Sequence, residues 1–347
     1  MSVDLLIVGG GPVGLVTALI ARRRGLVVEV VEPRVQPVDK ACGEGIMPAG
    51  LALLSELKID PPGHVIRGIR YLSEDRSVDA RFSRGVGRGV RRTQLQLLLL
   101  EAVRAEGVTV HSSAVVGIAE SASGVEATLR DGASRHASFV AGADGLHSSI
   151  RRLCGLSAPA RRAVRRRGLR RHFAVEPWSD LVEVHWSPAA EAYVTPVGER
   201  LVGVAVLTER VGSFDEQLAD FPALGERLRR APPASSITGA GPFRQRTTAR
   251  TRGRVALVGD AAGYVDAITG EGLTVGWRQA AALVDAIASG SLDGYERDWR
   301  RVVRRSTMLT SGLLAAARIP AARRILVPSA VRMPRLFGQI VDLASRG

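Results

Sequence analysis

The stretch Asp4-Leu5-Leu6-Ile7-Val8-Gly9-Gly10-Gly11-Pro12-Val13-Gly14 decides the fold. Its apolar start predicts a short strand over Leu5–Val8, and the periodicity that follows predicts a helix from Pro12 to Gly25. A second strand is expected over Val27–Val31. Strand, helix and strand in this order form a βαβ unit, which places the two strands parallel to each other in one sheet.

The glycines of this stretch follow the spacing G-x-G-x-x-G. Gly9 permits the tight turn, Gly11 lets the backbone approach a pyrophosphate, and Gly14 allows the helix to pack closely on the strand. The start of the helix would offer free N–H groups and a positive dipole end to phosphates. Glu32, at the end of the second strand, can accept hydrogen bonds from ribose hydroxyls. The unit is therefore predicted to bind a dinucleotide, but this motif does not distinguish NAD from FAD.

Two later segments bear on that choice. Phe139–Gly145 is an apolar run that ends in Asp-Gly, and Arg254–Gly263 is an apolar run that ends in Gly-Asp and a turn of small residues. Together with the glycine motif, in this order, the segments resemble the p-hydroxybenzoate hydroxylase-like FAD superfamily. That superfamily includes aromatic hydroxylases, halogenases and geranylgeranyl reductases, and the resemblance spans roughly residues 3–290.

The resemblance implies roles for single residues. Asp260 is expected to bind the flavin ribityl chain, and Asp144 to support the cofactor cleft. Arg92, at the start of a helix expected over Thr93–Glu106, is expected to reach the flavin or the pyrophosphate. Asp260 is also suited to cap a helix, a role that can coexist with cofactor binding. The expected FAD contacts are Gly9, Gly11, Pro12, Val13, Gly14, Glu32, Pro33, Arg34, Cys42, Arg92, Asp144, Gly145, Gly259, Asp260, Gly270, Gly272 and Leu273.

Two segments are similar to the geranylgeranyl-reductase branch of the superfamily. Lys40–Pro48 contains a Cys-Gly-x-Gly sequence, which the resemblance places beside the isoalloxazine, and Asp266–Leu273 contains Gly-Glu-Gly. The family usually has a proline shortly before the second segment's glycines, where this chain has Asp266-Ala267-Ile268. Gly270 and Gly272 would let backbone N–H groups approach the flavin N1–C2=O edge, and a helix starting there would stabilise reduced flavin. An ordinary turn before a helix is the alternative.

Cys42 and Lys40 each have two interpretations. Cys42 could contact the flavin or the substrate, or serve as a small buried apolar residue. Lys40 could pair with a phosphate or a substrate anion, or be solvated. The Trp-x-Trp-x-Ile-Pro signature of flavin halogenases is absent from the sequence, which disfavours halogenation.

The rest of the chain predicts an α/β protein, α+β overall. A Rossmann-like FAD/NAD(P)-binding domain is expected over residues 1–65, 91–155 and 251–294, interleaved with an antiparallel-sheet substrate domain over 66–90 and 156–250. A helical carboxy-terminal segment is expected over 295–347, interrupted by Pro320, Pro328 and Pro334. Short strands are expected over 66–90, near 108–117, 124–130 and 136–143, and at 181–186, 192–195 and 201–207. Further helices are expected over 48–57 and from about 272 to 287.

Two side chains of the predicted antiparallel sheet are candidates for catalysis. The resemblance implies that this sheet covers the flavin and binds substrate with its inward residues. His185 or Tyr193 could act there as a general base or orient a phenol, and Cys42 is the third catalytic candidate. A structural role for either side chain of the sheet is the alternative.

Composition restricts the partners of the protein. The two cysteines, Cys42 and Cys154, exclude a disulfide framework, fit a cytoplasmic protein, and have no partner at metal-ligand spacing, so no metal is expected. The net charge of +14 comes almost entirely from arginine, and its densest run, Arg161–Arg171, is expected to be a solvated surface segment, with attraction to anionic lipid or an acidic substrate as the alternative. With 4% aromatic residues and no recognition motif, nucleic acid is not an expected partner. The chain enters a strand at once, so no signal peptide is expected.

The carboxy-terminal segment alternates apolar residues with arginines, and this pattern has two interpretations. It could lie on a membrane surface as a basic amphipathic element, or pack its apolar side over the rest of the chain. Membrane contact would favour a lipophilic substrate and a peripheral location on the membrane.

The family resemblance implies two candidate reactions. In the first, NAD(P)H reduces FAD, oxygen gives a C4a-hydroperoxyflavin, and a hydrophobic, aromatic or polyketide-like small molecule of secondary metabolism is hydroxylated. In the second, reduced flavin transfers hydride to the C=C bond of a lipophilic alkene, as in geranylgeranyl reductases. The broader superfamily is dominated by monooxygenases, so the first reaction is preferred. A binding module without catalysis is the third hypothesis, which retention of all three FAD motifs disfavours.

Overall fold

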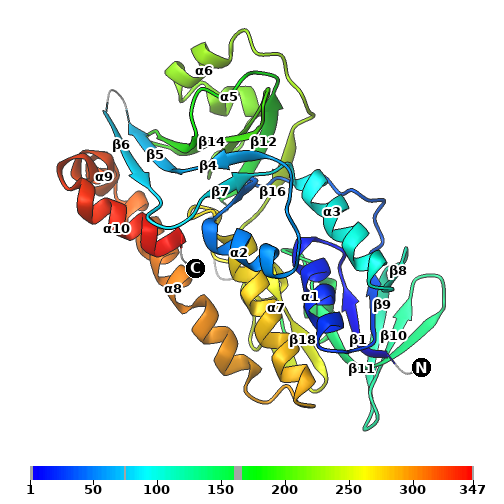
Figure 1. Cartoon of the computed structure of the whole chain (residues 1–347). Helices are drawn as coiled ribbons and strands as arrows, with labels where there is room; N and C mark the ends of the chain where they lie inside the picture. Colours follow the sequence, from blue (N-terminus) through cyan, green and yellow to red (C-terminus); the bar gives the residue numbers. More distant parts are fainter. Residues whose placement is uncertain (1–2, 74–75, 160–165, 346–347) are drawn as a thin grey trace.

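Three β-sheets and the helices packed on them organise the chain in a computed structural model, which describes residues 3–73, 76–159 and 166–345 (Figure 1). The largest sheet contains the βαβ unit predicted from the glycine stretch. Its strands are β1 (Val3–Val8), β2 (Val28–Val31), β8 (Thr109–His111), β9 (Val115–Glu120), β10 (Val125–Leu129), β11 (Ser134–Gly142), β17 (Thr251–Arg252) and β18 (Val255–Leu257). The parallel strands run in the order β18-β11-β1-β2-β8, with β1 at the centre. The expected α/β class is confirmed.

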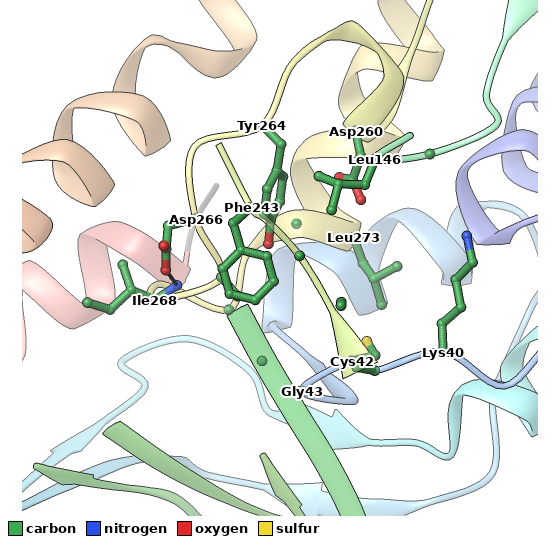
Figure 2. Close-up of a pocket in the computed structure, with 18 of the residues that line it drawn as sticks. Lys40, Cys42, Gly43, Leu146, Phe243, Asp260, Tyr264, Asp266, Ile268 and Leu273 are labelled. Carbon is green, nitrogen blue, oxygen red and sulfur yellow. Dashed lines mark hydrogen bonds between the residues drawn. The ribbon is translucent and has the colours of Figure 1, made fainter. Parts of the chain in front are cut away.

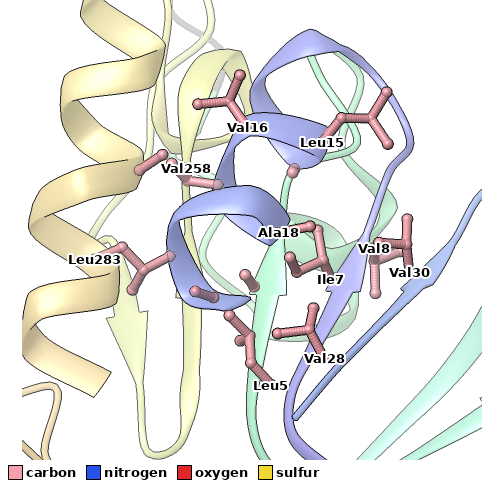
Figure 3. Close-up of a cluster of buried hydrophobic side chains, with 14 of the residues drawn as sticks. Leu5, Ile7, Val8, Leu15, Val16, Ala18, Val28, Val30, Val258 and Leu283 are labelled. Atoms are coloured by element: carbon pink, nitrogen blue, oxygen red, sulfur yellow. The ribbon is translucent and has the colours of Figure 1, made fainter. Parts of the chain in front are cut away.

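The side chains of the central strand β1 are apolar on both faces of the sheet, because other elements cover both faces. Leu5, Leu6 and Ile7 are fully buried, as expected for an interior strand of a parallel sheet. The helices α1 (Pro12–Arg23), α3 (Arg92–Ala105) and α7 (Gly272–Ala288) lie side by side on this sheet (Figure 1). Leu15 of α1 and Leu283 of α7 belong to the same apolar cluster as the strands (Figure 3).

The second sheet contains the alternating strands predicted in the second half of the chain. Its order is β16-β12-β15-β14-β13-β5-β6, antiparallel except where β13 runs parallel to β5. The strands are β5 (Gly68–Ser73), β6 (Arg76–Arg81), β12 (Arg167–Phe173), β13 (Leu181–Trp186), β14 (Ala190–Gly198), β15 (Leu201–Thr208) and β16 (Thr238–Ala240). Two short helices, α5 (Phe214–Leu218) and α6 (Pro222–Leu228), contribute to the apolar cluster on this sheet.

A small third sheet lies against β14 of the second sheet. It consists of β3 (Gly45–Ile46), β4 (His64–Ile66) and β7 (Gly87–Gly89), and α2 (Pro48–Glu56) follows β3 directly. The single strand expected near 108–117 is instead two strands, because β8 pairs with β2 while β9 pairs with β10. The remaining short elements are α4 (Ser149–Leu153) and a 3₁₀ turn over Gly259–Ala262.

The carboxy-terminal segment is helical, as predicted. It forms α8 (Tyr295–Arg318), α9 (Pro320–Arg332) and α10 (Pro334–Ser345). Pro320 and Pro334 each begin a helix, where proline is tolerated because the first N–H groups have no partner in the helix. Pro328 was expected to interrupt the segment, and this was wrong, because α9 continues through it.

The same segment uses its apolar side for packing. Val327 and Val341 are buried against the second sheet, and the ring of Phe337 meets Tyr71 of β5 edge to face at 4.9 Å. In Figure 1, α9 and α10 lie against β5 and β6. These contacts favour the packing alternative for the arginine-rich tail. Within the described ranges, no helix combines the length and the hydropathy needed to cross a bilayer.

The arginine-rich run is not a solvated segment where the structure describes it. Residues 161–165 lie outside the described residues, but Arg166 and Arg170 are only 7% and 1% exposed. Arg166 forms ion pairs with Glu191 and with Asp266, the second at 3.0 Å. The expectation of solvation was wrong for Arg166 and Arg170, because Arg166 pairs with Glu191 and Asp266, and Arg170 bonds to His172, to Asp39 and to the Lys40 carbonyl.

The buried ion pairs of Arg166 predict a large effect on stability. Replacing Arg166 by Ala removes the cation that pairs with the buried carboxylate of Asp266 and that also contacts Glu191, which should cost about 3–5 kcal/mol of unfolding free energy. The matched control is Arg229→Ala, which removes an exposed pair with Glu226 and should cost less than about 1 kcal/mol. Urea denaturation of both variants tests this, and equal losses would contradict it.

Candidate active site

One large cavity lies between the first sheet and the second sheet. Its volume is ≈ 1610 Å³, above the roughly 300–1,000 Å³ of a pocket for one drug-sized ligand. It extends from Gly11 to the start of α7 and to the inner side of β13 and β14. Figure 2 shows side chains from the Lys40–Gly43 loop, from the segment before α7 and from Phe243 pointing into it. The cavity has room for a dinucleotide and a second molecule.

The glycine motif forms one end of this cavity. Gly9 has a backbone φ of 120°, and a Cβ added there or at Gly14 would overlap backbone atoms. Gly11 differs, because its added Cβ would meet only the Arg92 guanidinium, at 3.9 Å. Gly9 and Gly14 therefore allow close packing of the backbone, whereas Gly11 keeps the cavity wall free of a side chain.

Glu32 lies behind the cavity wall. It is 1% exposed, and its carboxylate accepts hydrogen bonds from the Gly10 N–H at 2.9 Å and from the Arg34 guanidinium at 2.6 Å. Burial opposes ionisation, but the bonds and charge of Arg34 hold the pKa of Glu32 below its usual value. Arg34 lines the cavity, whereas Glu32 does not. Pro33 is exposed and outside the cavity wall.

Two aspartates lie further along the cavity. Asp144 accepts hydrogen bonds at Oδ2 from the Ser149 N–H and hydroxyl, while its buried Oδ1 has no hydrogen-bond partner among the described residues. Burial raises the pKa of Asp260, and Lys40 and Arg92 partly offset this. Burial lowers the pKa of Lys40, and Arg34 and Arg92 add to the effect.

These features fit FAD. A pyrophosphate requires an open backbone at Gly11 and nearby cations, which Arg34, Lys40 and Arg92 supply. The free acceptor of Asp144 and the carboxylate of Asp260 suit hydroxyl donors of ribose and ribityl groups. The expected contacts that line the cavity are Gly11, Pro12, Val13, Arg34, Cys42, Arg92, Asp144, Gly145, Gly259, Asp260, Gly270, Gly272 and Leu273. Gly9, Gly14, Glu32 and Pro33 do not line it.

The loop that carries Cys42 is fixed by a buried carboxylate. Glu44, a non-glycine residue at φ 57°, accepts a hydrogen bond from the Arg92 N–H at 2.8 Å and contacts His172 Nε2 at 2.5 Å. Because Arg170 donates to His172 Nδ1, the Nε2 atom carries the proton that is donated to Glu44. Burial raises the pKa of the Cys42 thiol, so this side chain is neutral. Sequence reasoning missed Glu44, although its position inside the Cys-Gly-x-Gly segment was the available signal.

The inner side of β13 and β14 forms the apolar end of the cavity. Val182 and Val184 line it, whereas His185 points to the other face of β13 and contacts Glu183 at 3.1 Å. Tyr193 lines the cavity and donates its hydroxyl hydrogen to the Ile268 carbonyl at 2.9 Å. Burial raises the pKa of Tyr193 well above its ordinary value. The cavity thus brings Tyr193 and Cys42 together and leaves out His185.

Two acidic residues beside this end were not predicted as site residues. Asp266 lines the cavity, accepts a hydrogen bond from the Ile268 N–H (Figure 2) and is paired with Arg166. Glu271 is 4% exposed, lines the cavity and accepts a hydrogen bond from the Ser306 hydroxyl at 3.1 Å. Burial raises the pKa of Glu271 to about 7. No group of ligating side chains suited to a metal ion occurs in the described part of the chain.

The fold and this cavity define a flavin-dependent oxidoreductase. A family model described as "FAD binding domain" matches residues 2–307, so the chain belongs to this family of FAD-dependent oxidoreductases. The resemblance to the p-hydroxybenzoate hydroxylase-like superfamily is thereby confirmed.

The relatives include monooxygenases and reductases. The chain is 27% identical to 6-methylpretetramide 4-monooxygenase of Streptomyces rimosus over 93% of this chain and 88% of that protein. It is 28% identical to digeranylgeranylglycerophospholipid reductase of Methanothrix thermoacetophila, over 87% and 84%. A flavoprotein/dehydrogenase from Cytophaga hutchinsonii has the same fold, with a TM-score of 0.86, 20% identity, and coverage of 99% of this chain and 93% of that one.

Replacement by alanine should have different outcomes at Gly11 and at Gly14. Gly11→Ala should leave folding unchanged, because its Cβ enters open space, but should weaken FAD binding roughly tenfold or more, about 1.4 kcal/mol. Gly14→Ala should prevent stable folding, because its Cβ overlaps the Gly9 carbonyl. Thermal unfolding and FAD titration of the two proteins test this. Tight FAD binding by the Gly11 variant would contradict it.

The raised pKa of Glu271 predicts that the free energy of unfolding depends on pH. Its pKa is 4.5 in the unfolded chain and about 7 in the fold, so the folded state holds a proton that the unfolded state releases between these values. Its contribution to stability is therefore fully present below pH 4.5 and is lost as pH rises through about 7. The loss is on the order of 3 kcal/mol. Urea denaturation of wild type and Glu271→Gln at pH 5 and pH 8 measures it, and a difference between the proteins that is constant with pH would contradict it.

Proposed function

We propose that this chain is an NAD(P)H-dependent monooxygenase that hydroxylates a hydrophobic aromatic or polyketide-like small molecule. The observation that carries the proposal is the cavity, which joins a dinucleotide end lined by cations to an apolar end on the second sheet. Monooxygenases and hydroxylases predominate among the relatives, including 6-methylpretetramide 4-monooxygenase.

The chain's own residues would bind, orient and exclude water. Arg34, Lys40 and Arg92 would hold the cofactor's phosphates, and Asp260 its ribityl hydroxyls. FAD, when bound, supplies electron transfer from the nicotinamide cofactor and the activation of oxygen. Val182 and Val184 would pack against an apolar substrate and keep water from the reacting atoms.

Tyr193 would orient the substrate in this scheme. Its hydroxyl hydrogen is already donated to the Ile268 carbonyl, so its oxygen offers an acceptor to a substrate hydroxyl. The raised pKa keeps the phenol neutral, which suits hydrogen bonding and excludes a phenolate base near neutral pH. We therefore assign Tyr193 to positioning, and the proton acceptor of the reaction is a different group.

A second candidate function has its own observation. Cys42 lines the cavity as a neutral thiol within the Cys-Gly-x-Gly loop, which resembles that of geranylgeranyl reductases. A flavin-dependent C=C reductase acting on a lipophilic alkene would use the same apolar end. The similarity to digeranylgeranylglycerophospholipid reductase supports this alternative.

One experiment separates the two functions. The FAD-loaded protein is reduced without oxygen by NADH or NADPH and then mixed with ¹⁸O₂ and candidate aromatic or polyketide substrates. Incorporation of one ¹⁸O atom into product, detected by mass spectrometry, is expected. Saturation of an isoprenoid alkene under nitrogen, with no labelled product in oxygen, would overturn the proposal in favour of the reductase.

Neighbouring residues of β13 provide a matched pair of variants. Val184→Phe fills the apolar end and should lower turnover of a bulky substrate at least about tenfold, because the substrate no longer fits. His185→Phe changes the other face of the strand and should leave turnover within about twofold. Equal effects of the two variants would contradict the placement of the substrate against β13.

A further inference from the structure

Glu271 is a buried acid at the wall of the cavity that the proposed function does not use. It lies between Gly270 and Gly272, directly before the first turn of α7, and it is 4% exposed. The chain has a φ of 69° at Gly270, so the backbone turns sharply just before this side chain. Both glycines also line the cavity, which places the carboxyl beside the expected position of the flavin.

The groups that act on Glu271 or are acted on by it lie in its own segment and in α7, α8 and β5. Ser306 of α8 donates a hydrogen bond to its Oε2 atom at 3.1 Å, and the hydroxyl of Thr269 also favours the ionised carboxyl. Thr269 in turn contacts Thr310 of α8 at 3.1 Å, so the long carboxy-terminal helix holds this segment at two points. The remaining groups whose charge acts on Glu271 or is acted on by it are Arg305 of α8, Arg278 of α7 and Tyr71 of β5.

Among the side chains that the structure describes, Glu271 accepts a hydrogen bond from the Ser306 hydroxyl and takes part in no ion pair. Arg305 and Arg278 favour the charged form from further away, and burial opposes it more strongly. The balance makes protonation of Glu271 sensitive to any change of charge in the cavity.

Reduction of a bound flavin is such a change. A reduced flavin holds negative charge at its N1–C2=O edge, which the N-terminus of α7 would stabilise through its free N–H groups. A nearby carboxylate would oppose that charge, whereas a neutral carboxyl would not. Reduction therefore favours the protonated form of Glu271, and reoxidation favours the ionised form.

We propose that Glu271 exchanges a proton with solvent in step with the redox state of the flavin, taking one up on reduction and releasing it on reoxidation. Two electrons and one proton reach the flavin as a hydride from the reductant, and a solvent proton converts the Glu271 carboxylate to the carboxyl. The hydride would leave the reductant with the electron pair of the bond that breaks there, and proton uptake would form one O–H bond on Glu271 while breaking one O–H bond in solvent. The inference rests on the proposed function only for the flavin's placement against Gly270–Leu273, and not for the substrate or the reaction with oxygen.

The test is the reduction potential of bound FAD between pH 5 and pH 9, measured on the full-length holoprotein without substrate. In wild type, an extra proton per two electrons is expected in an interval around pH 7, seen as a steeper dependence of potential on pH. Glu271→Gln should lack this interval. Glu199→Gln, which changes an exposed carboxylate elsewhere, should retain it. Identical pH profiles of wild type and Glu271→Gln would overturn the proposal.

If the Glu271→Gln variant does not bind FAD, the Ser306→Ala variant provides a second test of the proposal. The Ser306 hydrogen bond favours the ionised carboxyl, so its removal should move the steep interval to higher pH. An unmoved interval would assign the proton to another group and overturn the proposal. Because no substrate is present, failure of the monooxygenase proposal in the ¹⁸O₂ experiment leaves this measurement unaffected, and the two failures are distinguishable.

Discussion

The close contact of α1 with β1 and β11 is the constraint on which the rest of the structure depends. Gly9, Gly14 and Ala143 meet so closely that no side chain fits at either glycine. This contact fixes the start of α1 directly over the carboxyl end of β1, between β2 and β11. The N–H groups of that helix start then face the cavity, as in other dinucleotide sites of parallel sheets. The end of the cavity at Gly11, where the cofactor is proposed to bind, follows from packing of the backbone before any charged residue contributes.

The second sheet reaches this cofactor end through one buried network. Glu44 joins the Cys42 loop to the start of α3 and, through His172, to Arg170 of β12. Its left-handed backbone costs about 1–3 kcal/mol for a non-glycine residue, so the surrounding bonds must offset that cost. Arg170 also contacts Asp39 and donates to the Lys40 carbonyl at 3.0 Å. Strand β12 thus holds the loop on which Lys40 and Cys42 lie.

The sequence predicted the parts of the protein that depend on local pattern. The βαβ unit, α3, α7 and the strands β13–β15 all follow from apolar periodicity and glycine spacing, which neighbouring residues encode. His185 was a candidate because it alternates with Val184, but alternation does not say which face of a strand meets a cavity. Arg166 and Glu271 were missed for a related reason. Their burial depends on partners far along the chain, Glu191 for one and Ser306 for the other.

In the segment before α7, contacts with distant residues take the place of the proline that the family usually has there. A proline fixes the backbone by its ring, whereas here Asp266 accepts a hydrogen bond from the Ile268 N–H two residues on, which is the geometry of an Asx turn. Arg166 holds the same carboxylate and also reaches Glu191 on β14, so the turn is tied to the second sheet. Tyr193, from the same strand, donates to the Ile268 carbonyl and secures the other side of that peptide segment. The shape of this part of the cavity wall is therefore set by an ion pair between the segment before α7 and the second sheet, and a change in the second sheet would be transmitted to the cavity through Asp266.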